Sequence, residues 1–98
     1  MFDVQLLKGK KIVVTGGGTG LGKSMATRFA ELGADLVITS RRQNVIDETA
    51  KALREHGGKV LAISCDVRDT EQVESMVEQT VSEFGTIDIL LNLSLIHI

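Results

Sequence analysis

The sequence predicts an α/β fold in which four strands alternate with three helices and form a parallel sheet of the doubly wound type. Short apolar runs alternate with segments of helical periodicity, and a glycine follows each of those segments. The strands are almost continuously apolar, which is typical of a parallel sheet covered by helices on both faces. Short connections between alternating elements also imply right-handed crossovers.

Each element is predicted from its own residues. The apolar runs place strands at 11–15, 35–39, 59–64 and 87–91, and the helical periodicity places helices at 21–32, 44–56 and 70–84. Gly33, Gly57 and Gly85 follow the helices, where glycine favours the left-handed conformation that ends a helix. Asp69 is the expected N-cap of the third helix. That helix carries an apolar stripe, which we expect to pack on the sheet: Val73, Met76, Val77, Thr80, Val81 and Phe84.

A glycine-rich loop, T-G-G-G-T-G-L-G from Thr15 to Gly22, links the first strand to the first helix. Without Cβ atoms, such a loop lets backbone N–H groups and the helix N-terminus approach a phosphate, so the sequence predicts nucleotide binding. The dinucleotide pattern G-x-G-x-x-G fails in every register. The P-loop pattern G-x-x-x-x-G-K-[ST] matches Gly17 to Ser24, and T-G-x-x-x-G-x-G matches Thr15 to Gly22.

The end of the second strand favours a dinucleotide over a P-loop triphosphate. Ser40, Arg41 and Arg42 stand where an acid would accept hydrogen bonds from a free ribose 2′-hydroxyl. Arginine instead suits a 2′-phosphate, which points to NADP(H) as the cofactor. The P-loop interpretation leaves the arginine pair without a role, although Asp66 could then serve as its magnesium-binding acid.

The pattern T-G-x-x-x-G-x-G resembles that of the short-chain dehydrogenase/reductase family, and the similarity extends over residues 7–92. It implies the N-terminal half of a Rossmann-type sheet, truncated after the fourth strand. Cys65-Asp66-Val67 resembles the adenine-binding turn of the family, and Asp88 to Asn92 resembles the start of its D-x-L-x-N-N-A-G segment, in which Asn92 would tie strand four to its neighbours. The resemblance implies this set of cofactor-binding residues: Gly16, Gly18, Thr19, Gly20, Leu21, Gly22, Ser40, Arg41, Arg42, Asp66, Val67 and Asn92.

Within the family, the segments 16–23, 40–42 and 65–69 are most similar to those of 2,4-dienoyl-CoA reductases. That resemblance implies an NADPH-dependent reduction of a dienoyl-CoA in the breakdown of unsaturated fatty acids, by a homo-oligomer. The alternatives within the family are a 3-oxoacyl reductase and a sugar or alcohol dehydrogenase, whose substrate would be a carbonyl compound. A P-loop nucleotidase or kinase, and a non-catalytic interaction module, remain as different classes.

Two observations indicate that residues 1–92 are only part of a dinucleotide-binding domain. The catalytic Tyr and Lys of the family lie in the second half of the domain and the chain has no tyrosine, so we assign no catalytic residue and no metal site. After Asn92 the family continues Asn-Ala-Gly, whereas the chain reads Leu-Ser-Leu-Ile-His-Ile. This hexapeptide is the translation of CTG TCT CTT ATA CAC ATC, a transposon adapter of sequencing libraries. We therefore interpret residues 93–98 as a non-native tail. The alternative is a genuine short protein with a divergent fourth strand.

Composition excludes several partners. The 98 residues carry a net charge of −2, which leaves no basic surface for nucleic acid. No apolar run reaches the length of a membrane span, and residues 1–10 lack the apolar core of a secretory signal. A single cysteine, Cys65, excludes an internal disulfide and fits a reducing compartment. We therefore expect a cytoplasmic protein whose partner is a small-molecule substrate.

Overall fold

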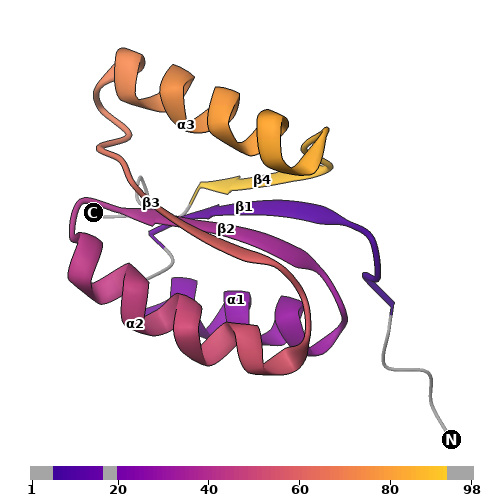
Figure 1. The fold of residues 1–98 in the computed structure, drawn as a ribbon. Coiled ribbons are helices and arrows are strands. Elements are labelled where there is room, and N and C mark those ends of the chain that lie inside the picture. Colours follow the sequence, from indigo (N-terminus) through magenta and orange to yellow (C-terminus); the bar gives the residue numbers. More distant parts are fainter. Residues whose placement is uncertain (1–5, 17–19, 93–98) are drawn as a thin grey trace, which may run out of the picture.

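The computed structural model describes residues 6–16 and 20–92, which form one four-stranded sheet with helices on both faces (Figure 1). All strand pairs are parallel, in the order β3-β2-β1-β4, and this confirms the predicted fold class. In Figure 1, α1 and α2 lie against one face and α3 lies against the other. The elements in chain order are β1 (Lys11–Thr15), α1 (Gly20–Glu31), β2 (Asp35–Ser40), α2 (Gln43–Leu53), a 3-10 turn (Arg54–His56), β3 (Val60–Ser64), α3 (Thr70–Phe84) and β4 (Ile89–Asn92).

The predicted element boundaries agree with the structure to within one residue except at two places. The second helix was expected to continue to residue 56, but its α-helical part ends at Leu53 and the last three residues tighten into the 3-10 turn. Strand four was expected from residue 87, but β4 begins at Ile89. The side chain of Ile87 packs into the core beneath α3 before the chain pairs with β1, so this residue lies outside the ladder.

Local capping explains where α3 begins and ends. The Asp69 carboxylate accepts hydrogen bonds from the backbone N–H groups of Glu71 at 3.0 Å and Gln72 at 3.4 Å, as predicted for an N-cap. At the other end Gly85 has φ +84°, and its N–H donates to the Val81 carbonyl at 2.7 Å. That left-handed conformation costs glycine little, so the helix ends there.

Side chains of alternate strand residues divide the core into two clusters. On β1, Ile12 and Val14 face α1 and α2, whereas Val13 faces α3, and β2 repeats the pattern. The cluster beneath α1 and α2 consists mainly of fully buried residues, and the cluster beneath α3 contains several half-buried ones. Because both faces of β1 and β2 are covered, these two strands read as continuous apolar runs in the sequence.

The structure corrects the expectation that the whole apolar stripe of α3 packs on the sheet, and it leaves part of β4 uncovered. Val81 is 43% exposed, and on β4 the side chains of Ile89 and Leu90 are 42% and 57% exposed. Met76 and Thr80 of α3 are buried as predicted, with Val73, Val77 and Phe84 half-buried. Among the described helices, α3 is the one on this face of the sheet, and a single helix is too narrow to cover all four strands.

Charged groups hold the amino ends of the strands together. The Lys11 ammonium pairs with the Asp35 carboxylate, whose other oxygen accepts from the Lys59 N–H at 2.9 Å. The Lys11 N–H donates to the Asp88 carboxylate and the Lys11 carbonyl accepts from the Asp88 N–H, both at 2.8 Å. Burial disfavours the charged form of Asp35, but the hydrogen bonds from Lys11 and Lys59 outweigh it and lower the pKa of this carboxyl. One cluster therefore joins the starts of all four strands.

The outer edge of β3 is partly closed by two side chains from the segment before it. The Lys59 carbonyl and the Cys65 N–H bond to β2, so the peptide groups of the alternate residues 60, 62 and 64 point away from the sheet. Gln43 uses both ends of its amide there: Nε2 donates to the Ala62 carbonyl at 3.3 Å, and Oε1 accepts from the Ser64 N–H at 3.2 Å. Arg54 donates twice to the Val60 carbonyl, at 3.2 and 2.8 Å.

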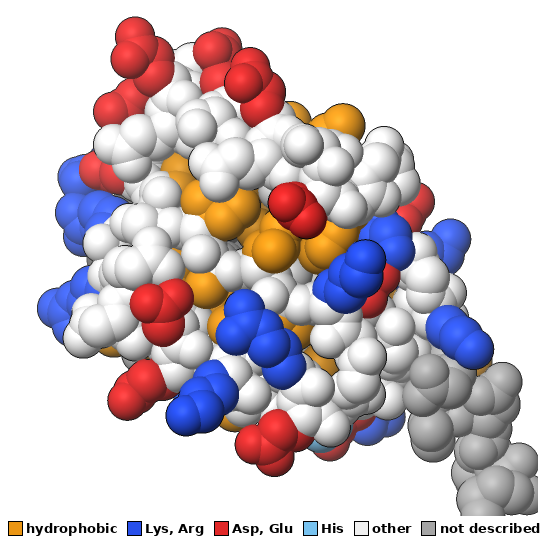
Figure 2. Space-filling model, viewed as in Figure 1, with side chains coloured by type: hydrophobic (Ala, Val, Ile, Leu, Met, Phe, Trp, Pro, Cys, Tyr) orange, Lys and Arg blue, Asp and Glu red, His pale blue; other side chains and the backbone are white. Residues whose placement is uncertain are grey.

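A groove runs along this edge between α2 and α3, and Figure 2 shows apolar side chains gathered in the hollow. Its volume is about 510 Å³, and Leu61, Ala62 and Ile63 of β3 form its floor. Asp47 and Glu78 lie on its two walls. The groove contains none of the residues predicted to bind a cofactor.

Candidate cofactor site

The predicted site residues within the described part of the chain gather at the carboxyl edge of the sheet. Thr15 at the end of β1 is in register with Thr39 of β2 on one side and with Asn92 of β4 on the other. The chain leaves β1 toward β2 and later crosses back to β4, so the order reverses between β1 and β4. In open α/β sheets, ligands bind outside the carboxyl ends of the strands at such a reversal. Gly18 and Thr19 lie outside the described residues.

The described glycines of the loop have different structural roles. Gly16 has φ +77°, and its N–H donates to the Thr39 carbonyl at 2.8 Å, so it turns the chain directly after β1. Gly20 has φ +58°, is exposed, and has no atom within 4 Å of the position where a Cβ would stand. Gly22 is buried within α1. Leu21, between them, is 63% exposed. The loop therefore leaves open space beside the backbone at Gly20.

The N-terminus of α1 suits an anionic group. The first turn of this twelve-residue helix contains no acidic residue, so nothing there opposes the positive end of the helix dipole. Lys23 and Ser24, which a P-loop would direct at a triphosphate and magnesium, are exposed on the helix. These features fit the pyrophosphate of a dinucleotide.

The end of β2 exposes two arginines. The Ser40 hydroxyl accepts from the Arg42 N–H at 3.0 Å, which turns the chain into α2, and Arg42 precedes that helix without a side-chain cap. Both Arg41 and Arg42 are exposed, and neither forms an ion pair with another residue in the described part of the chain. Two cations at this position suit a phosphate oxyanion.

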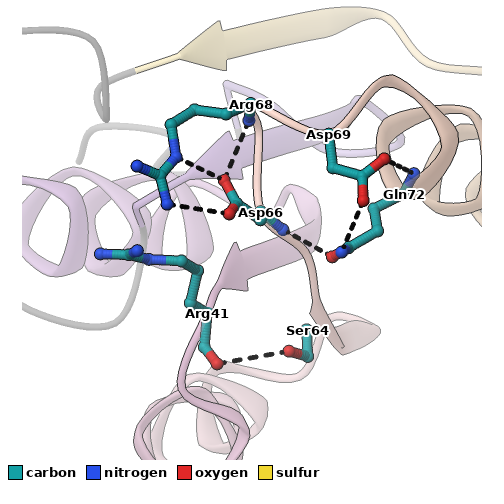
Figure 3. Close-up of polar contacts among 6 residues, drawn as sticks. All are labelled: Arg41, Ser64, Asp66, Arg68, Asp69 and Gln72. Carbon is teal, nitrogen blue, oxygen red and sulfur yellow. Dashed lines mark hydrogen bonds and ion pairs between the residues drawn. The ribbon is translucent and has the colours of Figure 1, made fainter.

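At the end of β3, Arg68 clasps the carboxylate of Asp66 (Figure 3). The Arg68 N–H and Nε donate to Oδ1 of Asp66 at 3.0 and 3.1 Å, and Nη2 donates to Oδ2 at 3.0 Å. These hydrogen bonds, with a smaller charge effect of Arg41, lower the pKa of Asp66 to about 2. Val67 is half-buried beside them.

Gln72 fixes the same turn from α3. Its Oε1 accepts from the Asp66 N–H at 2.9 Å, and its Nε2 donates to the Asp69 carboxylate at 3.0 Å. Sequence reasoning missed both Arg68 and Gln72. The spacing of Asp66 and Arg68 is that of an Asx-turn, in which a side chain accepts from the N–H two residues on, so the turn itself was detectable.

The end of β4 is joined to β1 through side chains. The Thr15 hydroxyl donates to Oδ1 of Asn92 at 2.7 Å, which is the predicted link between strand four and its neighbour. Thr39, in register with Thr15 on β2, is fully buried, and its hydroxyl has no hydrogen-bond partner among the described residues. Burying a hydroxyl without a partner costs roughly 1–3 kcal/mol.

The described residues include neither a reactive thiol nor a cluster that could hold a metal ion. Cys65 is buried, and burial with the nearby Asp66 and Asp69 charges raises the pKa of its thiol, so it is a poor nucleophile. Within residues 6–16 and 20–92, no three His, Cys, Asp or Glu side chains are placed to hold a metal ion. No helix in the same ranges has the length and apolar composition needed to cross a membrane.

Taken together, the parallel sheet and its glycine loop define a doubly wound nucleotide-binding domain. The family model of the short-chain dehydrogenases matches residues 10–94, and the chain belongs to that family. The family match sets aside the P-loop nucleotidase alternative. The position of Asp66 also argues against a P-loop, in which this acid would bind magnesium. The end of β3 lies two strands from the loop, roughly 10 Å at the usual spacing.

Relatives in the family have varied substrates. A peroxisomal 2,4-dienoyl-CoA reductase of Arabidopsis thaliana is 36% identical over 91 residues, covering 93% of this chain and 30% of the relative. The citronellol catabolism dehydrogenase of Pseudomonas aeruginosa superposes with a TM-score of 0.85 at 39% identity, covering 92% of this chain and 38% of that one. The L-sorbose reductase of Gluconobacter frateurii, solved with NADPH and L-sorbose, gives 0.85 at 38% identity, covering 91% and 34%. The chain thus spans about a third of the length of these relatives.

The neighbouring threonines provide a test of the site's hydrogen bonding. We expect Thr39→Val to raise the free energy of unfolding by about 1 kcal/mol, since it removes a buried hydroxyl without a partner. Thr15→Val should lower it by about 1 kcal/mol, because Asn92 loses a donor. Urea denaturation of the full chain measures both. Equal destabilisation by the two substitutions would contradict the unpaired state of Thr39.

Proposed function

We propose that this chain supplies the cofactor-binding part of an NADPH-dependent oxidoreductase. The observation that carries the proposal is the pair of exposed arginines, Arg41 and Arg42, at the end of β2, where no acid is present. A 2′-phosphate would find two cations there, whereas a free 2′-hydroxyl would find no carboxylate acceptor on this turn. The NADPH in the L-sorbose reductase structure shows that a relative of similar fold holds this cofactor.

Each part of the cofactor has a matching group of residues in this proposal. The pyrophosphate would lie against the glycine loop and the α1 N-terminus, and the 2′-phosphate against Ser40, Arg41 and Arg42. Asp66 and Val67 would contact the adenine, and Asn92 would line the ribose edge. The residues proposed to surround the pyrophosphate are Gly16, Gly18, Thr19, Gly20, Leu21 and Gly22.

For the substrate, we propose a 2,4-dienoyl-CoA. The support is the similarity of segments 16–23, 40–42 and 65–69 to such reductases, together with the Arabidopsis relative. The cofactor would supply a hydride to the conjugated chain, and a proton donated from outside the described residues would complete the reduction. A 3-oxoacyl compound, or a sugar or alcohol, is the second candidate, because the L-sorbose and citronellol enzymes are equally similar. We place the enzyme in the cytoplasm as a homo-oligomer.

The domain proposal is that residues 1–92 begin a longer reading frame and that residues 93–98 derive from an adapter. Residues 93–98 lie outside the described part of the structure. Genomic DNA downstream of the Asn92 codon should then encode Asn-Ala-Gly and, further on, a Tyr and a Lys in the family's arrangement. Sequencing the locus from unamplified DNA provides the test. An in-frame stop directly after an Ile98 codon would refute the adapter origin.

Cofactor preference tests the role of Arg41 in the protein encoded by the complete frame. NADPH should bind more tightly than NADH, and Arg41→Asp should remove most of that preference, because a repelling anion replaces a cation. A charge-assisted contact is worth about 1.5–3 kcal/mol, or roughly one to two decades in affinity. Lys51→Asp, on the exposed face of α2, makes the same change of charge as a control. Equal dissociation constants for the two cofactors before mutation would overturn the assignment.

The glycine loop is tested by a pair of variants that separate folding from binding. Gly20→Asn should fold, since asparagine tolerates φ +58°, but its side chain would enter the space proposed for the phosphates. We expect binding of NADPH to fall at least about tenfold, measured by cofactor fluorescence. Lys23→Ala should change the binding energy by less than about 1 kcal/mol, because Lys23 is exposed one turn into the helix. Loss of binding in Lys23→Ala with retention in Gly20→Asn would contradict the proposed loop.

A further inference from the structure

Among the described residues at the carboxyl edge of the sheet, Arg68 is the one whose guanidinium is paired with a carboxylate. It donates three hydrogen bonds to Asp66, two from the side chain and one from the backbone, although the Arg68 side chain is itself 70% exposed. An ion pair this exposed contributes little to the stability of a fold. We therefore consider its effect on the charges at the site.

The carboxylate held by Arg68 lies within the electrostatic range of Arg41. The charge of Arg41 acts on Asp66 but no hydrogen bond joins them, and all three contacts to the carboxylate come from Arg68. In Figure 3 the guanidinium groups of Arg41 and Arg68 extend to the same side of Asp66. The Asp66 carboxylate thus lies near two guanidinium groups, and it is hydrogen-bonded to Arg68.

The arrangement decides how much positive charge remains for a ligand. Arg41, Arg68 and Asp66 together have a net charge of +1, whereas Arg41 and Asp66 alone would sum to zero. Without Arg68, the Asp66 carboxylate would be free to pair with Arg41. A phosphate monoester carries about −1.5 to −2 at neutral pH, so it would meet both a repelling carboxylate and an occupied arginine.

We propose that Arg68 is a specificity-determining residue that keeps Arg41 available to the cofactor's 2′-phosphate by holding the Asp66 carboxylate in a bidentate clasp. The inference rests on the proposed NADP preference and deepens it. Arg68 acts through Asp66 and does not itself contact the phosphate. It is a positioning residue, and its effect is confined to ligands that carry a 2′-phosphate.

A double-mutant cycle on the full chain tests this mechanism with two small probes. Adenosine 2′,5′-bisphosphate carries the 2′-phosphate and adenosine 5′-monophosphate lacks it, and calorimetry gives both dissociation constants. The readout is their ratio, because any contact of Asp66 with the adenine affects both probes alike. Arg68→Gln should reduce the preference for the bisphosphate roughly three- to tenfold, as expected for one charge several ångströms away in a partly screened site.

Removing the carboxylate as well should restore the preference. In Asp66→Asn/Arg68→Gln no anion remains to capture Arg41, so the ratio should return to within about twofold of the wild-type value. Arg28→Gln is a matched control, since the Arg28 side chain is also 70% exposed and paired with an acid, at the far end of α1. It should leave the ratio unchanged. Circular dichroism of each variant checks that the fold is retained.

The remaining outcomes separate the two proposals. A wild-type preference that survives in Arg68→Gln overturns the role of Arg68 and leaves the NADP assignment standing. If Arg68→Gln reduces the preference for the bisphosphate equally with Asp66 and with Asn at position 66, Arg68 contacts the phosphate directly. That result would overturn the clasp mechanism. A wild-type ratio near one would reject the NADP preference and this inference together.

Discussion

The cluster of Lys11, Asp35 and Asp88 joins the amino ends of the strands, and this constraint helps to align their opposite ends. Lys11 is joined to Asp35 of β2 and to Asp88 before β4, and Asp35 reaches on to the Lys59 N–H before β3. Four parallel strands that start from one cluster also end together, as their in-register pairing shows. The carboxyl edge can then carry a glycine turn and the exposed Arg41 and Arg42, because the opposite edge also aligns the strands.

Local chemistry made much of the fold predictable. Asp69 and Gly85 mark the ends of α3 because capping depends on residues within one turn, and the buried runs of β1 and β2 predict a sheet covered on both faces. The exposure of Val81 on α3 was not predictable in the same way. It depends on the width of sheet that one helix can cover, which periodicity along the chain does not contain.

In the candidate site, too, some residues were predictable from the sequence and others depended on tertiary contacts. Arg41 was identified because it follows an apolar strand at the edge where parallel strands end together, and Asn92 was identified through the resemblance of residues 88–92 to a segment of the family. The contacts of Arg68 and Gln72 were missed, because several donors compete for Asp66 and only the three-dimensional arrangement decides which of them succeeds. The unpaired hydroxyl of Thr39 likewise looks no different in the sequence from that of Thr15, whose partner lies 77 residues away.

Gln43 and Arg54 make one edge of the sheet less able to pair with a further strand. A strand adding to β3 would have to displace an amide that already substitutes for a peptide group on Ala62 and Ser64, and a guanidinium that already occupies the Val60 carbonyl. Pairing on that side therefore begins with the loss of hydrogen bonds. A strand added to this sheet would therefore pair more readily at β4, so Gln43 and Arg54 would influence the order of strands that they do not contact.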